Sequence, residues 1–66
     1  MNVILYSTGC PKCKILEKKL NEKNVTYTNV SDVETMLSMG LSTVPMLEVD
    51  GDMMKFSDAI KFVNNL

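Results

Sequence analysis

The sequence has no histidine and only two cysteines, and these absences limit the chemistry that the chain can support. Cys10 and Cys13 are so close in the sequence that a disulfide between them would close too small a loop to stabilise a fold. A zinc site needs four ligands, and one chain lacks the histidines or further cysteines that usually complete it. We therefore expect the pair to serve thiol chemistry, or to hold a metal shared with another molecule.

Long apolar runs are also missing, and the charge is nearly balanced. The run Val3–Tyr6 is far shorter than the roughly 20 residues of a membrane-spanning helix. Because no basic segment precedes it and no small-residue cleavage pattern follows, we expect no signal peptide and a cytoplasmic protein. Net charge is −1, and no aromatic residues interleave with the lysines, so we expect neither a nucleic-acid nor a membrane partner.

What the sequence does contain is a regular succession of structure-forming segments. The 66 residues, 45% of them apolar, predict one folded domain over 1–66. The pattern predicts strands over 3–6, 25–30, 46–49 and 52–56, and helices over 11–23, 33–39 and 58–66. A strand, helix and strand in succession predict a right-handed βαβ unit. The expected order is β-α-β-α-β-β-α.

Side-chain patterns predict how these elements end and which residues they bury. Asn24 and Gly40 are expected to end the first two helices, and Asp50-Gly51 to form a two-residue hairpin turn. Ser31-Asp32 is expected to cap the short helix, and Ser57 the last one. The residues expected to point inward from these two helices are Val33, Met36, Leu37, Ala59, Ile60, Val63 and Leu66.

The cysteines lie between the first strand and the first helix. Pro11 suits the first helical position, which places Cys10 at the helix N-terminus, where free N–H groups and the helix dipole favour a thiolate. Cys13 follows one turn later. We expect the side chain of Lys12 or Lys14 to assist ionisation of the first thiol.

A C-x-x-C pattern next to a βαβ unit favours redox chemistry, but two alternatives stay open. The pair could belong to a metal or iron–sulfur carrier in which two chains share the ligands. It could also lie in a non-catalytic binding module, whose cysteines would have ordinary pKa values. Tyr6, just before the motif, is expected either to line the approach to Cys10 or to pack on the first helix.

The order of elements, with Cys10-Pro11-Lys12-Cys13 at the first strand–helix junction, resembles the thioredoxin fold in its shortest, glutaredoxin-like form. Thr43-Val44-Pro45 is the second motif that carries the resemblance, which covers nearly the whole chain. It implies an α/β fold with a mixed sheet of order 2-1-3-4, whose third strand is antiparallel to the first. The first and last helices would cover one face of the sheet, and the short helix the other.

The resemblance also implies a thiol–disulfide oxidoreductase. Cys10 would attack the substrate disulfide and Cys13 would resolve the intermediate. Pro45 would follow a cis peptide bond beside the cysteines, and Thr43 and Val44 would contact the substrate. The implied protein is a monomer without a bound cofactor, reduced by glutathione as co-substrate or by thioredoxin reductase. Its implied target is a protein disulfide, with ribonucleotide reductase as one example.

Two positions differ from the glutaredoxin pattern. Glutaredoxins hold glutathione with a lysine before the active site and with a glycine pair and acidic residues before the last helix. Here Thr8 stands nearest the lysine, while Ser57 and Asp58 remain without the glycine pair. The NrdH-type electron donors to ribonucleotide reductase also lack the full set, but their usual sequence before the last helix is absent here. The sequence leaves the reductant open.

Overall fold

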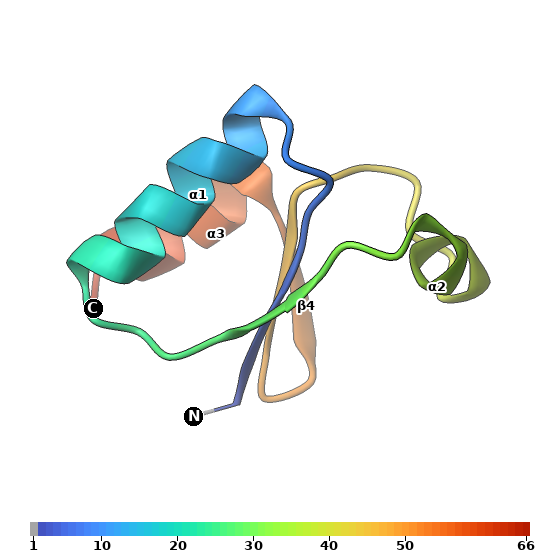
Figure 1. Ribbon diagram of the computed structural model, residues 1–66. Helices are drawn as coiled ribbons and strands as arrows, with labels where there is room; N and C mark the ends of the chain where they lie inside the picture. Colours follow the sequence, from blue (N-terminus) through green and yellow to red (C-terminus); the bar gives the residue numbers. More distant parts are fainter. Residues whose placement is uncertain (1) are drawn as a thin grey trace.

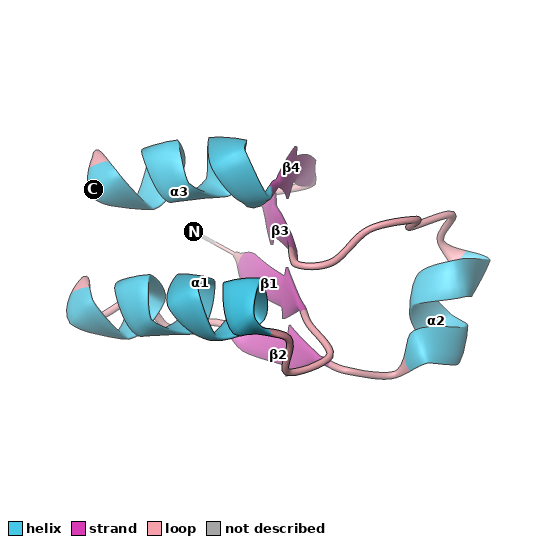
Figure 2. Ribbon diagram, turned by 90° about the horizontal axis from the view of Figure 1, so that it is seen from above, coloured by secondary structure: helices cyan, strands magenta, loops and turns pink. Residues whose placement is uncertain are grey.

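The computed structural model describes residues 2–66. It consists of a four-stranded sheet with helices on both sides (Figures 1 and 2). The strands are β1 (Val3–Tyr6), β2 (Thr28–Val30), β3 (Met46–Val49) and β4 (Asp52–Lys55). The helices are α1 (Pro11–Glu22), α2 (Val33–Ser38) and α3 (Phe56–Asn64). Their succession confirms the predicted order of elements. Within residues 2–66, no helix is long and apolar enough to cross a membrane.

The strands are arranged in the order β2-β1-β3-β4. β1 is parallel to β2 and antiparallel to β3, which in turn pairs with β4 through a hairpin. The turn of this hairpin is Asp50-Gly51, where both residues have positive φ angles, 49° and 91°. Such angles match the twist of antiparallel strands. The sheet order, the antiparallel third strand and the hairpin therefore confirm the predictions.

One face of the sheet is covered by α1 and α3, which lie side by side in Figure 2. Alternate residues of β1 and β3 point to this face because successive strand side chains point in opposite directions. The core that they form with the two helices contains Val3, Leu5, Leu16, Leu20, Leu47, Val49, Ala59 and Val63. Burying this apolar surface is the main favourable contribution to folding.

α2 lies on the other side of the sheet, as predicted (Figure 2), and meets it where β1 ends and β3 begins. There, a second cluster of buried side chains consists of Tyr6, Met36 and Met46. Only Met36 of α2 is buried, whereas Val33 is 53% exposed and Leu37 is 67% exposed. The prediction that Val33, Met36 and Leu37 all point inward is therefore wrong for Val33 and Leu37. A helix of 6 residues makes fewer than two turns and presents only one side chain to the sheet.

The second strand is shorter than predicted, because it begins at Thr28 and not at Val25. α1 ends in a Schellman turn, with Asn24 at φ 57° and the Val25 N–H donating to the Leu20 carbonyl at 3.0 Å. This turn uses the Val25 backbone, which is then not available for a sheet ladder. Val25 and Tyr27 pack instead against the core from a loop.

The start and end of α3 also differ from the predictions. α3 begins at Phe56, directly after β4, so Ser57 lies inside the first turn and does not cap it. Lys55 occupies the cap position without a side-chain hydrogen bond. The helix ends at Asn64, and Leu66 beyond it is 48% exposed. Ala59 and Val63 are fully buried and Ile60 is half-buried, as the pattern predicted.

Candidate active site

The cysteine pair lies where β1 leads into α1. Cys10 is the N-cap residue of α1 and Pro11 is the first helical residue, as predicted. The Cys13 N–H donates to Cys10 Sγ at 3.3 Å, and the Lys14 N–H donates to the Cys10 carbonyl oxygen at 3.0 Å. The sulfur therefore accepts the bond that a serine or aspartate oxygen accepts at most helix starts.

The two thiols differ in exposure. Cys10 is half-buried and reaches the surface, whereas Cys13 is fully buried. A substrate disulfide can therefore approach the first sulfur but not the second. This asymmetry is what the resemblance implied for an attacking and a resolving cysteine.

The thiols also differ in acidity. The Cys13 side chain, hydrogen-bonded to the first sulfur, is the main cause that lowers the pKa of Cys10. Partial burial opposes this effect, and backbone N–H groups of Cys13, Lys12 and Cys10 add to it. Burial raises the pKa of Cys13, and the neighbouring Cys10 sulfur raises it further. The site thus favours a thiolate at Cys10 and a protonated thiol at Cys13.

Lys12 makes a contact that the sequence did not predict. The Lys12 ammonium lies 5.7 Å from the centre of the Phe56 ring, in a cation–π contact. Lys12 lowers the pKa of Cys10 through its backbone N–H. The expected assistance from the side chain of Lys12 or Lys14 stays a prediction.

The contact between Lys12 and Phe56 brings the first turns of α1 and α3 together. Ser57 and Asp58, two predicted binding residues, lie in that first turn of α3 and are exposed. Both residues therefore lie next to Phe56, the residue that Lys12 of the cysteine motif contacts.

The Thr43–Pro45 segment lies on another side of the motif. The Val44–Pro45 peptide bond is cis, as predicted, and the Pro45 side chain is fully buried. Tyr6 at the end of β1 pairs with Met46 at the start of β3. Since these strands are antiparallel, the loop that leads to Cys10 and the loop that ends in Pro45 leave the sheet at the same edge (Figure 1).

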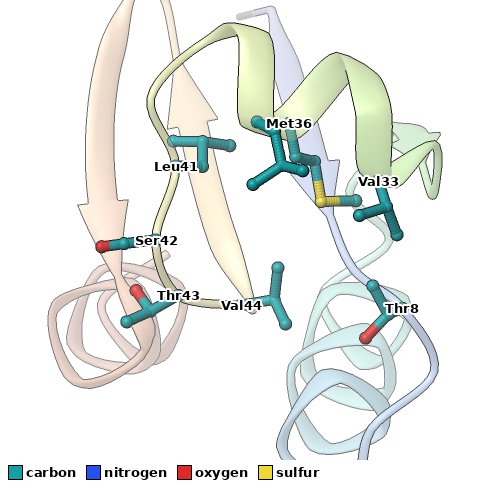
Figure 3. A pocket seen from close by; sticks show the side chains of 8 residues that line it. Thr8, Val33, Met36, Leu41, Ser42, Thr43 and Val44 are labelled. Atoms are coloured by element: carbon teal, nitrogen blue, oxygen red, sulfur yellow. The ribbon is translucent and has the colours of Figure 1, made fainter.

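A pocket of about 190 Å³ opens between these two loops and α2 (Figure 3). The residues that line it are Thr8, Val33, Met36, Leu37, Leu41, Ser42, Thr43 and Val44. Thr43 and Val44 were predicted binding residues, whereas the contribution of α2 was missed. One sequence signal could have indicated it: α2 is too short to bury all of its apolar residues, so some of them must lie at the surface.

Tyr6 takes neither of the two places expected for it. Its ring is buried on the α2 face with Met36 and Met46, and its hydroxyl donates to Glu48 Oε1 at 3.1 Å. Burial raises the pKa of Tyr6, and the hydrogen bond and negative charge of Glu48 raise it further. Tyr6 therefore packs on α2 instead of α1.

Residues 2–66 contain no cluster of three or more histidine, cysteine, aspartate or glutamate side chains that could hold a metal ion. Cys10 and Cys13 are the two cysteine ligands that one chain offers to a metal.

These observations define a class: a small protein of thioredoxin fold, with paired cysteines at a helix N-terminus beside a cis-proline loop. The chain is 30% identical over 59 residues to a thioredoxin from Methanothermobacter thermautotrophicus, in a match covering 80% of this chain and 77% of that one. No family model matches the chain, and no solved structure gives a significant match. The chain belongs to the thioredoxin family, and it is a thiol–disulfide oxidoreductase of the thioredoxin type.

Proposed function

We propose that the protein reduces disulfides in other proteins with Cys10 as the nucleophile and Cys13 as the resolving thiol. The Cys10 thiolate attacks one sulfur of the substrate disulfide, which forms a mixed disulfide and releases the other substrate sulfur as a thiolate that takes up a proton. Cys13 then loses its proton and attacks Cys10 Sγ. The substrate leaves as a dithiol, and its two electrons have come from the Cys10–Cys13 pair.

The observation that carries this proposal is the hydrogen bond from the Cys13 N–H to Cys10 Sγ, together with the unequal burial of the two thiols. The bond marks the exposed sulfur as an acceptor at the helix N-terminus, and acceptors there are best when negatively charged. The buried thiol lies one turn away, within reach of the mixed disulfide.

The source of electrons is part of the proposal. A cycle needs two electrons to restore the dithiol, supplied either by two glutathione molecules or by a flavin-dependent thioredoxin reductase. Both supplies operate in reducing compartments such as the cytoplasm, where we place the protein as a monomer without a bound cofactor. Ribonucleotide reductase exemplifies the class of target, a protein disulfide that must be reduced repeatedly.

Steady-state reduction tests this function. The protein is supplied with a protein disulfide and NADPH, in parallel with thioredoxin reductase or with glutathione and glutathione reductase. We expect NADPH consumption with one of the two donors, and we expect Cys10→Ser to abolish it.

The matched variant is Cys13→Ser, which keeps the nucleophile and removes the resolving thiol. This variant is expected to accumulate a mixed disulfide with the substrate, visible as an added mass in the intact protein. An inactive wild type under both donors, with an ordinary Cys10 pKa, would contradict the proposal and favour a binding module.

A further inference from the structure

Ser7, which lies between β1 and the cysteine motif, is the buried polar residue of the chain that the structure describes, with an exposed fraction of 2%. Its N–H donates to the Val30 carbonyl oxygen at 3.0 Å, and its hydroxyl donates to Asn29 Oδ1 at 2.9 Å. The first bond continues the pairing of β1 with β2 by one residue beyond Tyr6. Two hydrogen bonds therefore fix Ser7 against the edge strand β2, where the chain leaves the sheet for the cysteines.

The Ser7 side chain lies on the side of the sheet that α1 covers. Leu5, two residues earlier, points to that side, and side chains along a strand alternate between the two sides. Asn29 is paired with Leu5 in the register of β1 and β2, so it points to the same side. Cys13 is buried with Leu16 on α1. Ser7 and Asn29 are therefore on the same side of the sheet as the resolving thiol.

The next residue, Thr8, connects this pair to Cys13. Burial is the largest influence on the pKa of Cys13 and raises it, whereas a hydrogen bond from the Thr8 backbone lowers it. The Thr8 nitrogen belongs to the rigid peptide unit that joins it to Ser7. Beyond Thr8 the chain turns at Gly9, which has a φ of 82°, and reaches Cys10. The two bonds of Ser7 therefore help to determine where the Thr8 N–H points.

The hydrogen bond from Thr8 gains importance after the first step of the reaction. In the free dithiol, burial raises the pKa of Cys13, and the hydrogen bond and negative charge of the Cys10 sulfur raise it further. Once Cys10 is joined to a substrate, its sulfur is neutral, so the effect of its charge ends. The Thr8 N–H still favours ionisation of Cys13, because a thiolate accepts a hydrogen bond more strongly than a thiol does.

From this arrangement we propose that Ser7 and Asn29 are positioning residues for the resolving step, because they hold the Thr8 N–H toward the Cys13 sulfur as it becomes a thiolate. In that step Cys13 loses its proton to water, and its thiolate attacks Cys10 Sγ. The Cys10–Cys13 bond forms, the bond from Cys10 to the substrate breaks, and the substrate sulfur leaves as a thiolate that takes up a proton. The inference rests on the proposed function and assigns two further residues to the same reaction.

The test separates the two steps with a chromogenic disulfide, dithiobis(nitrobenzoate). This reagent releases one yellow thiolate when Cys10 attacks it, and a second when Cys13 resolves the mixed disulfide. Stopped-flow absorbance of the reduced protein with one equivalent of the reagent gives both rates. The second release is first-order when it occurs within one molecule, and it is measured from pH 6 to pH 10.

Asn29→Ala removes the acceptor of the buried Ser7 hydroxyl. We expect the second release to become about fivefold slower at pH 7 and the first release to stay nearly unchanged. A weaker bond from Thr8 raises the pKa of Cys13 in the mixed disulfide, so the midpoint of the pH profile is expected about 0.7 unit higher. Above the midpoints of both proteins Cys13 is ionised in each, and the two rates are expected to converge.

Three further variants assign the effect to the pair. Asn29→Asp keeps an acceptor oxygen and is expected to restore most of the rate of the second release. Thr28→Ala changes an exposed neighbour on β2 whose side chain points to the other side of the sheet, and it is expected to alter neither release. The double variant Ser7→Ala/Asn29→Ala is expected to be no slower than Asn29→Ala, because both changes remove the same interaction.

Three results with Asn29→Ala would overturn the inference. The second release could equal that of the wild type at every pH, or it could be slower by one constant factor at every pH. The first release could also fall by the same factor as the second, which would indicate a general loss of structure. An unchanged first release shows that the Cys10 site and the fold are intact.

A failure of the proposed function gives a different result. A wild type without a rapid first release, or a first-order second release that survives in Cys13→Ser, would overturn the proposed function itself. If the wild type shows both releases and Cys13→Ser shows the first alone, the function stands, and the variants of Ser7 and Asn29 decide the inference.

Discussion

A sulfur atom caps the first helix of this protein, because Cys10 Sγ accepts a hydrogen bond from the Cys13 N–H at the start of α1. A thiolate is a stronger acceptor than a thiol, so the capping hydrogen bond also contributes to the lowered pKa of Cys10. The Cys13 thiol makes the largest contribution to the lowered pKa of Cys10, ahead of the backbone N–H groups. The acidity of Cys10 therefore depends on Cys13 before any substrate arrives.

At the residue scale, we expect Cys10 to be alkylated by iodoacetamide with a pKa below the ordinary value of about 8.5. Cys13→Ala is expected to raise this pKa without fully restoring the ordinary value, because the backbone N–H groups remain. Lys12→Gln is expected to shift it less, since the ammonium lies over Phe56. A larger shift in Lys12→Gln than in Cys13→Ala would contradict this assignment of causes.

At the element scale, α2 depends on its two ends. Asp32 accepts hydrogen bonds from the Glu34 N–H at 3.1 Å and from the Thr35 hydroxyl at 2.7 Å. At the other end, Gly40 has a φ of 80° and the Leu41 N–H donates to the Met36 carbonyl at 3.0 Å. These caps matter because a helix this short gains little from its own hydrogen bonds.

We expect Asp32→Ala to lower the free energy of unfolding by about 1 kcal/mol, since it removes the cap of α2. Asp32→Asn keeps an acceptor oxygen and is expected to lose less. Urea denaturation of the reduced proteins measures both changes, with Ser31→Ala as the neighbouring control. An equal loss in Ser31→Ala and Asp32→Ala would show that Asp32 is not the cap in solution.

At the scale of the whole molecule, the two thiols make stability depend on pH in opposite directions. The pKa of Cys10 is lowered on folding. The stability that this thiol contributes is therefore present above the unfolded pKa of about 8.5 and is lost as pH falls through the folded pKa. The pKa of Cys13 is raised on folding, so its contribution is present below about 8.5 and is lost as pH rises through its folded pKa.

We therefore expect the reduced wild type to gain stability over a Cys10→Ser/Cys13→Ser variant as pH rises toward about 8.5, and to lose it above that value. Urea denaturation of both proteins in a thiol reductant, from pH 5 to pH 10, measures the difference. Subtracting the variant removes the contributions of Tyr6 and Tyr27, whose raised pKa values also reduce stability at high pH. A difference that does not change with pH would contradict the opposite shifts.

Much of this fold could be predicted because local rules and tertiary packing agree. An uninterrupted apolar run identified β1, and the Asp50-Gly51 turn signal marked the end of β3. Residues able to adopt a positive φ, Asn24 and Gly40, marked the ends of α1 and α2. The cysteine site was predictable for the same reason, since Pro11 fixes where the helix begins.

Other features of the fold could not be predicted, because they depend on how neighbouring segments pack and not on local sequence. Val25 and Tyr27 have strand-forming side chains, but the turn that ends α1 places them on the core as a loop. Val33 and Leu37 are apolar yet exposed, because α2 presents only Met36 to the sheet. The pocket arises where the loop before Cys10 meets α2 and the loop that follows α2, so no single segment of the sequence contains it.

The pairing of β1 with β3 has a consequence for the newly synthesised chain. These neighbours are far apart in the sequence, Val3 facing Val49, so the centre of the sheet forms only after β3 has left the ribosome. Until then α1 is an isolated helix of 12 residues, which is marginally stable in water, and Cys10 has no fixed helix end to favour its thiolate. An unfinished chain therefore carries two ordinary thiols, and the reactive pair arises only with the completed fold.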